Sequence, residues 1–235
     1  MVRSYEPVSS RRGVIPNKHS ASDWLYLLVL VTLDNIGKKF GREWIFRSVS
    51  STFGTDEPTV ILGANGSGKS TLLQIISGAL MQGEGKVLYS QKGKEIQQEK
   101  IYSQLSYASP YLELMEELTL GEMITFQSKF KKWRKNYSDK DVLQLSGLEK
   151  EKDKFIRNFS SGMKMRTKLT LAILADTSLL LLDEPCSNLD HNAAKWYDEL
   201  VKNNLDGRTV VVCSNEAKEE YSFCKNEMRM EDFKK

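Results

Sequence analysis

The stretch TVILGANGSGKST, residues 59–71, decides the fold of this chain. Its first four residues, Thr59–Leu62, form a short apolar run, which is typical of a strand buried on both faces of a sheet. The last residues lead into 70–80, where apolar side chains at 72, 73, 75, 76 and 79 predict a helix. Between strand and helix, Gly63–Ser70 matches the pattern G-x-x-x-x-G-K-[ST]. This order predicts an α/β protein with a phosphate-binding loop.

The loop predicts how a nucleoside triphosphate and its metal ion would be held. Glycines let main-chain N–H groups turn inward around an anion, and the N-terminus of the following helix adds partial positive charge. We expect Lys69 to reach the β and γ phosphates and the Ser70 hydroxyl to bind Mg²⁺. The predicted phosphate-binding residues are Gly63, Ala64, Asn65, Gly66, Ser67, Gly68, Lys69, Ser70 and Thr71.

A second motif, LLLLDEP at residues 179–185, carries two adjacent carboxylates. Leu179–Leu182 predicts a buried strand, and α/β sheets bind ligands at the carboxyl ends of their strands. We expect Asp183 to hold Mg²⁺ through water, and Glu184 to polarise an attacking water molecule. The two motifs together predict hydrolysis of the bound nucleotide.

The composition narrows the class of protein. With 235 residues, the chain fits one large domain or a domain with a sub-domain. It has 34 Lys and Arg against 31 Asp and Glu, a net charge of +3 and a pI of about 8.6. A nucleic-acid reader usually has a pI above about 9 with clustered basic residues, so no nucleic acid is expected among the partners. Three cysteines without a C-x-x-C pair, and two histidines, favour free thiols over a zinc site.

The remaining patterns predict strands alternating with helices, and hence a parallel sheet. A turn over Lys38–Glu43 could join the first two strands as a hairpin. The segment from Met115 to Phe155 is charge-rich and helix-like, and we interpret its basic stretch Lys129–Lys135 as a solvated helix face, with contact to nucleic acid or lipid headgroups as the alternative. The apolar run Trp24–Leu33 is shorter than the roughly 18 residues of a membrane span. The further predicted strands are 27–33, 44–53, 86–89 and 209–213.

The segment FSSGMKMR, residues 159–166, together with the two motifs above, resembles the ATP-binding subunit of ABC transporters. The resemblance covers about Val31 to Asn215. It implies an α/β fold: a P-loop NTPase core with a mostly parallel sheet, an antiparallel β sub-domain and an inserted α-helical sub-domain at about 115–158. We expect the ATP-binding domain at 27–218, an unstructured polar leader at 1–26 and a C-terminal tail at 219–235.

The resemblance also implies further ATP contacts. The family's signature segment usually reads Leu-Ser-Gly-Gly-Gln, and this chain keeps Ser160 and Gly162 of it. In the family, this segment caps the γ phosphate of ATP bound to the opposite subunit, which implies a homodimer or a pairing with another ABC ATPase. Ser187–Asp190 resembles the loop that crosses that interface. Phe40, 23 positions before Gly63, matches the aromatic residue that stacks on adenine.

The same resemblance implies a membrane partner. The family's helical sub-domain contacts an integral membrane permease, and ATP-driven closure and opening of the paired subunits powers transport. The chain would then be cytoplasmic and peripheral on the inner face of the cell membrane. Because the permease selects the transported molecule, this sequence does not identify it.

Two positions depart from the family pattern. A glutamine usually stands nine residues before the threonine that corresponds to Thr119, and here that position is Pro110. The histidine expected after the last core strand is Asn215, which can still donate a hydrogen bond to a γ-phosphate oxygen but cannot carry charge. Loss of one transition-state donor typically lowers the rate by roughly 10²–10³. We therefore expect a slow ATPase, with Glu184, Lys69 and Asn215 as its catalytic residues.

Two other functions fit the same residues. Pro110 and Asn215 are compatible with an ATP sensor or regulatory module whose catalysis is impaired, although the intact Glu184 argues against it. A non-transport ABC ATPase acting on a ribosome or DNA is the other alternative. Such proteins usually carry two cassettes or long coiled-coil arms, which 235 residues do not accommodate.

Overall fold

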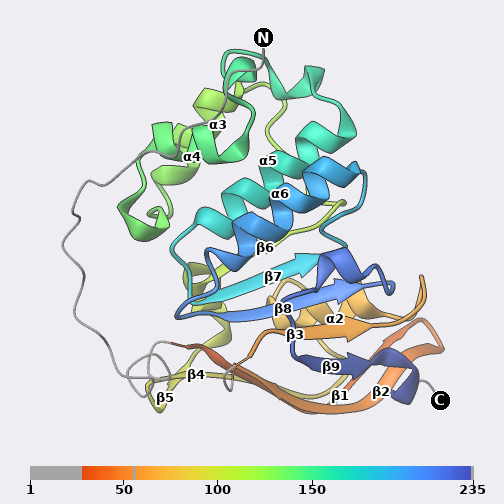
Figure 1. Ribbon diagram of the computed structural model, residues 1–235. Helices are drawn as coiled ribbons and strands as arrows, with labels where there is room; N and C mark the ends of the chain where they lie inside the picture. Colours follow the sequence, from red (N-terminus) through yellow and green to blue (C-terminus); the bar gives the residue numbers. More distant parts are fainter. Residues whose placement is uncertain (1–27, 55–56, 234–235) are drawn as a thin grey trace.

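Two sheets and two groups of helices make up the fold in the computed structural model, which describes residues 28–54 and 57–233 (Figure 1). The expected leader, 1–26, lies outside the described residues. An antiparallel sheet lies at the bottom of the view, and a parallel sheet lies above it. Helices α5 (Ser161–Leu174) and α6 (His191–Lys202) cover the upper face of the parallel sheet. The predicted α/β fold is confirmed.

The parallel sheet has five strands in the order β6-β7-β8-β3-β9. Three of them, β3, β7 and β8, confirm strands predicted from short apolar runs. Because all neighbours are parallel, the carboxyl ends of these strands meet at one edge of the sheet. The strands are β6 (Leu105–Ala108), β7 (Leu179–Asp183), β8 (Thr209–Ser214), β3 (Thr59–Leu62) and β9 (Asn226–Arg229).

Helix α2 (Lys69–Ile76) packs in the core between the two sheets. Alternate residues of the parallel strands face opposite sides: Ile61 and Leu181 lie in the core with α2, whereas Val60 and Leu182 lie in the core with α5 and α6. The helix buries Leu72, Leu73, Ile75 and Ile76 completely. Burial of each such side chain contributes about 1.5–3 kcal/mol. This packing holds the helix, and with it the loop at its N-terminus.

The antiparallel sheet has the order β2-β1-β4-β5. The predicted hairpin is present, but its turn is shorter than expected, because Lys38 and Lys39 belong to β1 and pair with Phe46 and Trp44. The Lys39 ammonium also lies 5.3 Å from the Trp44 ring centroid, which favours the extended pairing over a turn. The strands are β2 (Glu43–Phe53), β1 (Leu30–Phe40), β4 (Glu84–Gln91) and β5 (Lys94–Ile96).

The expected helical sub-domain contains two helices and several short 3₁₀ segments at the top of the view. Throughout the described ranges, no helix combines the length and apolarity that a membrane span requires. The helices are α3 (Leu120–Ser128) and α4 (Asp139–Ser146), and the 3₁₀ segments are η2 (Arg134–Asn136), η3 (Glu149–Glu151) and η4 (Ile156–Asn158).

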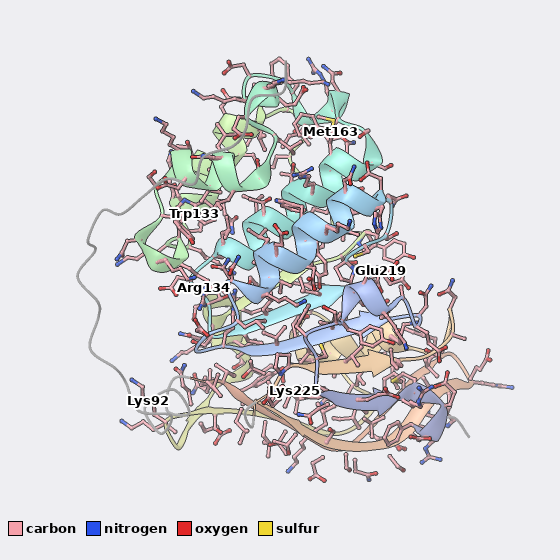
Figure 2. The ribbon with its side chains drawn as sticks, in the orientation of Figure 1. Lys92, Trp133, Arg134, Met163, Glu219 and Lys225 are labelled. Atoms are coloured by element: carbon pink, nitrogen blue, oxygen red, sulfur yellow. The ribbon has the colours of Figure 1, made fainter. Side chains whose placement is uncertain are left out.

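The interpretation of Lys129–Lys135 as a solvated helix face is wrong. Trp133 and Arg134 are buried between the helical group and one end of the parallel sheet (Figure 2). The cations of Lys131, Arg134 and Lys135 donate to the main-chain oxygens of Leu105, Asp206 and Asn203. The basic residues therefore join the helical sub-domain to β6 and to the end of α6.

Residues 219–233, expected as part of a tail, belong to the folded domain. Strand β9 pairs in parallel with β3, and the 3₁₀ helix η6 (Met230–Phe233) follows it. Met230 is fully buried. The sequence signal for β9 is weak because three of its four residues, Asn226, Glu227 and Arg229, are polar and exposed.

Ending the chain after Tyr221 should therefore prevent folding. The truncation removes β9 together with the buried side chains Phe223, Met228 and Met230, which contribute about 1.5–3 kcal/mol each. Their sum is comparable to the 5–15 kcal/mol that stabilises a typical domain. Thermal unfolding followed by circular dichroism checks this, with a chain ending after Phe233 as the matched control. A cooperative transition at unchanged Tm in the shorter chain would contradict it.

Candidate nucleotide-binding site

The phosphate loop needs glycine at its junction with α2. Gly68 is the N-cap of α2 and has φ +101°, in the left-handed region that favours glycine. A Cβ atom there would lie 2.7 Å from Ile45 Cγ2 and 2.8 Å from Phe46 Cδ1, so a side chain would collide with β2. The glycine thus allows both the turn and the close packing of the loop on the antiparallel sheet.

The loop is folded around its own lysine. Lys69 is 4% exposed, and its Nζ donates to the main-chain oxygens of Gly63 at 2.7 Å and Ala64 at 3.2 Å. Ser67 Oγ is buried and finds no hydrogen-bond partner among the residues that the structure describes. The first turn of α2 carries no acidic residue. An anion at this helix N-terminus would therefore meet one cation, main-chain N–H groups and a free hydroxyl.

A buried carboxylate lies beside the loop. Asp183, at the end of β7, is 1% exposed, and its Oδ1 accepts a 3.1 Å hydrogen bond from Ser70 Oγ. Its Oδ2 accepts a 3.3 Å hydrogen bond from Ser109 Oγ, just after β6. Burial raises the pKa of the Asp183 carboxyl, and the hydrogen bonds from Ser70 and Ser109 oppose that rise. Carboxylate and hydroxyl oxygens, together with phosphate oxygens, suit Mg²⁺, so these residues fit the ion.

Glu184 directly follows β7, at the carboxyl-end edge of the parallel sheet, and has an unusual backbone conformation. Its φ is +42°, which is uncommon for a residue other than glycine. Its N–H donates to Cys213 O at 2.9 Å, which ties the turn after β7 to β8. The side chain is half-buried. Strained backbone held by neighbouring strands is typical of functional sites.

The two positions that depart from the family pattern, Pro110 and Asn215, both lie at the carboxyl ends of the parallel strands. Asn215 directly follows β8, and its Nδ2 donates a long hydrogen bond of 3.5 Å to Asn65 Oδ1 in the phosphate loop. Pro110 lies in the loop after β6 and accepts, through its main-chain oxygen, a 2.7 Å hydrogen bond from Lys168 Nζ. The structure therefore brings Asn215 to the phosphate loop and fixes the Pro110 loop against α5.

The two signature residues, Ser160 and Gly162, lie at the start of α5 and not beside the phosphate loop. Ser160 is the N-cap of α5 and accepts from the Met163 N–H at 3.3 Å. A Cβ on Gly162 would lie 2.9 Å from Asn188 O, so the glycine lets the loop after β7 pass over the start of α5. Met163, in the first turn of α5, lies high in Figure 2, well away from α2 between the sheets. A single chain therefore does not join these residues to its own phosphate loop.

Phe40, the predicted adenine contact, ends β1 on the antiparallel sheet. Its side chain is 54% exposed, and the Lys38 ammonium lies 5.2 Å from its ring centroid. An exposed aromatic face beside a cation is suited to stacking on a planar group.

Glu220 is a site residue that sequence reasoning missed. It lies in the 3₁₀ helix η5 (Lys218–Glu220), and its Oε1 accepts the Cys186 N–H at 3.0 Å, in the loop that follows Glu184. Burial raises the pKa of the Glu220 carboxyl to about 7. Its main-chain oxygen accepts the Tyr197 hydroxyl at 2.8 Å. Nothing in the local sequence marks this glutamate, because its partners lie 23 and 34 positions away.

Glu231 is a second missed residue. Its Oε1 accepts the Ala64 N–H at 3.2 Å, so η6 supports the phosphate loop from a position 167 residues later in the chain. This N–H is then engaged by the protein itself.

Replacing Glu220 by Gln should change how stability depends on pH. A carboxyl whose pKa rises from 4.5 to about 7 on folding stabilises the folded state below pH 4.5, and this contribution is lost as the pH rises through 7. The Gln variant keeps the acceptor for Cys186 but not the charge. Its free energy of unfolding should therefore gain on the wild type by roughly 3 kcal/mol between about pH 4.5 and pH 8.

Urea unfolding at several pH values measures this difference. Glu219→Gln is the matched control, because Glu219 is the exposed neighbour on the same 3₁₀ helix (Figure 2). Parallel pH profiles for wild type and Glu220→Gln would show that the carboxyl is not strongly perturbed.

Comparisons with known proteins agree with this geometry. The ABC transporter family model matches residues 46–187, more than half of the chain. The uncharacterised ABC transporter ATP-binding protein YybJ of Bacillus subtilis (strain 168) is 28% identical over 202 residues, which are 83% of this chain and 89% of YybJ. The mouse retinal-specific phospholipid-transporting ATPase ABCA4 is 28% identical over 79% of this chain, which spans only 8% of that relative's length.

A solved structure shares the fold. The ATP-binding cassette MJ0796, in a dimeric post-hydrolysis state bound to ADP and Pi, superposes with a TM-score of 0.72 and 24% identity, over 85% of this chain and 93% of that chain. The family match, the YybJ relationship and this fold confirm the resemblance seen in the sequence motifs. The chain belongs to the ABC transporter family, as an ATP-binding domain of its ATPase class.

Proposed function

We propose that the chain binds and hydrolyses ATP as one half of a pair, and that the pair powers transport through a separate integral membrane permease. One observation carries the proposal: Ser70 Oγ lies 3.1 Å from Asp183 Oδ1, so the phosphate loop meets the acidic end of β7. A carboxylate beside the loop's hydroxyl is suited to holding the Mg²⁺ that accompanies a bound nucleoside triphosphate. Glu184, the next residue, supports hydrolysis rather than binding alone.

The chain's own residues would divide the chemistry. Lys69 Nζ exchanges its carbonyl partners for phosphate oxygens, because a cation binds an anion more strongly than a neutral oxygen. Mg²⁺ held by Ser70 and Asp183 would neutralise charge that develops on the phosphates. The Glu184 carboxylate accepts a proton from the attacking water. Asn215 Nδ2, already turned toward Asn65, donates to a γ-phosphate oxygen.

The distance between the signature residues and the phosphate loop in one chain supports pairing. Ser160 begins α5, whose main-chain N–H groups form a second anion site at a helix N-terminus. A nucleotide would contact both anion sites only when a second subunit supplies the second one. ATP then favours the closed pair because it binds both halves of it. The partner is a second copy of this chain or another ABC ATPase.

The family and the helical sub-domain support a membrane partner. A permease that contacts this sub-domain would place the chain on the cytoplasmic face of the membrane. The transported molecule is selected by the permease. ABCA4 is named as a phospholipid-transporting ATPase, but this chain matches only 8% of its length. The match therefore does not assign a substrate to this chain.

Catalysis by the isolated chain should be slow. Pro110 offers no side-chain hydrogen bond, and Asn215 cannot take up a proton as histidine can. These two positions also favour the second candidate function, an ATP sensor with impaired catalysis. A non-transport ABC ATPase acting on a macromolecule has no specific observation in its favour.

Glu184→Gln should abolish ATP turnover and trap a dimer in the presence of ATP, because the variant still binds nucleotide but lacks the proton acceptor. Steady-state phosphate release and light scattering measure the two effects. Glu199→Gln, an exposed carboxylate on α6, is the matched control. ATP binding without turnover in the wild type would favour the sensor.

Asn215→His should raise kcat by about tenfold or more, because imidazole restores a donor that can also carry charge. The same phosphate-release measurement tests it, with Asn192→His on the exposed face of α6 as control. An unchanged or lower kcat would mean that Asn215 does not limit the rate.

A further inference from the structure

Two main-chain N–H groups tie the turn that carries Glu184 to other parts of the fold. The φ of +42° at Glu184 is a strained conformation, which persists only where neighbouring contacts fix it. Pro185 has no N–H, so Glu184 and Cys186 are the first two residues of the turn that can donate from the main chain. The Glu184 N–H donates to Cys213 O of β8 at 2.9 Å. The Cys186 N–H donates to Glu220 Oε1 at 3.0 Å, so a side chain supplies the second anchor.

Glu220, which supplies this anchor, is itself held at both its main chain and its side chain. It is 4% exposed and lies in η5, five residues after Asn215. Its main-chain oxygen accepts a 2.8 Å hydrogen bond from the hydroxyl of Tyr197, which is fully buried in α6. Ser214, the last residue of β8, donates a hydrogen bond to its carboxylate. Because η5 follows Asn215 closely, the bond to Cys186 fixes the Glu184 turn relative to the segment after β8.

We propose that Glu220 is a positioning residue for ATP hydrolysis: its carboxylate anchors the Cys186 N–H and so holds the Glu184 carboxylate in place for the attacking water. The inference rests on the proposed function, since it needs Glu184 to act in hydrolysis. The described hydrogen-bond partners of Glu220 lie in the turn, in β8 and in α6, not in the phosphate loop. Loss of the anchor should therefore lower kcat without weakening the binding of ATP.

The groups around Glu220 make the strength of the anchor depend on pH. Among the described residues, the charged groups that act on its carboxyl are Glu184 and Glu219, and burial raises its pKa to about 7. Burial also raises the pKa of the other titratable groups that face it and keeps them neutral: the Cys186 thiol, the Cys213 thiol and the Tyr197 hydroxyl. An ionised carboxylate accepts a hydrogen bond more strongly than a neutral carboxyl, so the anchor should strengthen as the pH rises through 7.

Steady-state kinetics of ATP hydrolysis test the positioning role. Glu220→Ala should lower kcat by about tenfold and leave KM unchanged, because the turn loses one of its anchors. Glu220→Gln keeps a buried acceptor and should recover most of that loss. Between pH 6 and pH 8, the wild-type kcat should rise by about fivefold more than that of Glu220→Gln. Titration of the nucleotide is common to both chains and cancels in this comparison.

Hydrogen exchange tests the anchor without nucleotide. In Glu220→Ala, the Cys186 amide, followed by NMR, should exchange about tenfold faster than in the wild type, because its acceptor is gone. Glu219→Ala and Glu219→Gln are the matched controls for both measurements, since no described hydrogen bond joins this exposed neighbour to the turn. Thermal unfolding of each variant shows whether its fold is intact.

The outcomes separate this inference from the proposed function. No turnover in the wild type would overturn the proposed hydrolysis, and amide exchange would still show whether Glu220 anchors the turn. Turnover that Glu184→Gln abolishes but Glu220→Ala leaves unchanged would overturn the positioning role alone. A rise in KM that accounts for the loss in Glu220→Ala, or a wild-type pH profile parallel to that of Glu220→Gln, would also overturn it. If Glu220→Ala does not fold, the pH profile of Glu220→Gln decides the matter.

Discussion

The carboxylate of Asp183 joins segments that are far apart in the sequence. It accepts hydrogen bonds from Ser70, 113 positions earlier, and from Ser109, 74 positions earlier. A buried carboxylate without partners would be strongly destabilising, so the fold must keep these hydroxyls beside it. Parallel strands make this possible because their carboxyl ends share one edge. The phosphate loop, the Pro110 loop and Glu184 are all placed relative to this group.

Helix α2 adds the second constraint. It is held by apolar contacts to both sheets, so its N-terminus cannot move independently of either one. Gly68 brings the loop against Ile45 and Phe46 of β2, which belongs to the antiparallel sheet. The anion site therefore depends on the antiparallel sheet as much as on the parallel one.

The sequence predicted those features that depend on short, regular patterns. The strands at 59–62 and 179–182, the loop between Gly63 and Ser70, and the helix after it all follow from local residue types. The motif also anticipated that Ser70 and Asp183 would meet, because each motif fixes its side chain at the same sheet edge.

Features that depend on distant partners could not be predicted in this way. Glu220 and Ser109 look like ordinary polar residues until the fold surrounds them. The basic residues near Trp133 suggested a solvated face because a sequence does not show which carbonyl groups a lysine will reach. Strand β9 was missed because most of its side chains face outward.

The support that η6 gives to the phosphate loop has a consequence during translation. Strand β3 and the loop leave the ribosome early, but their partners are made much later: β8 about 150 residues later, and β9 and Glu231, which holds the Ala64 N–H, 167 residues later. The full set of contacts to β3 and its loop therefore cannot form until the segment through residue 231 has emerged. Because domains generally fold as units, we expect nucleotide-binding competence to be acquired late in synthesis rather than as each motif appears.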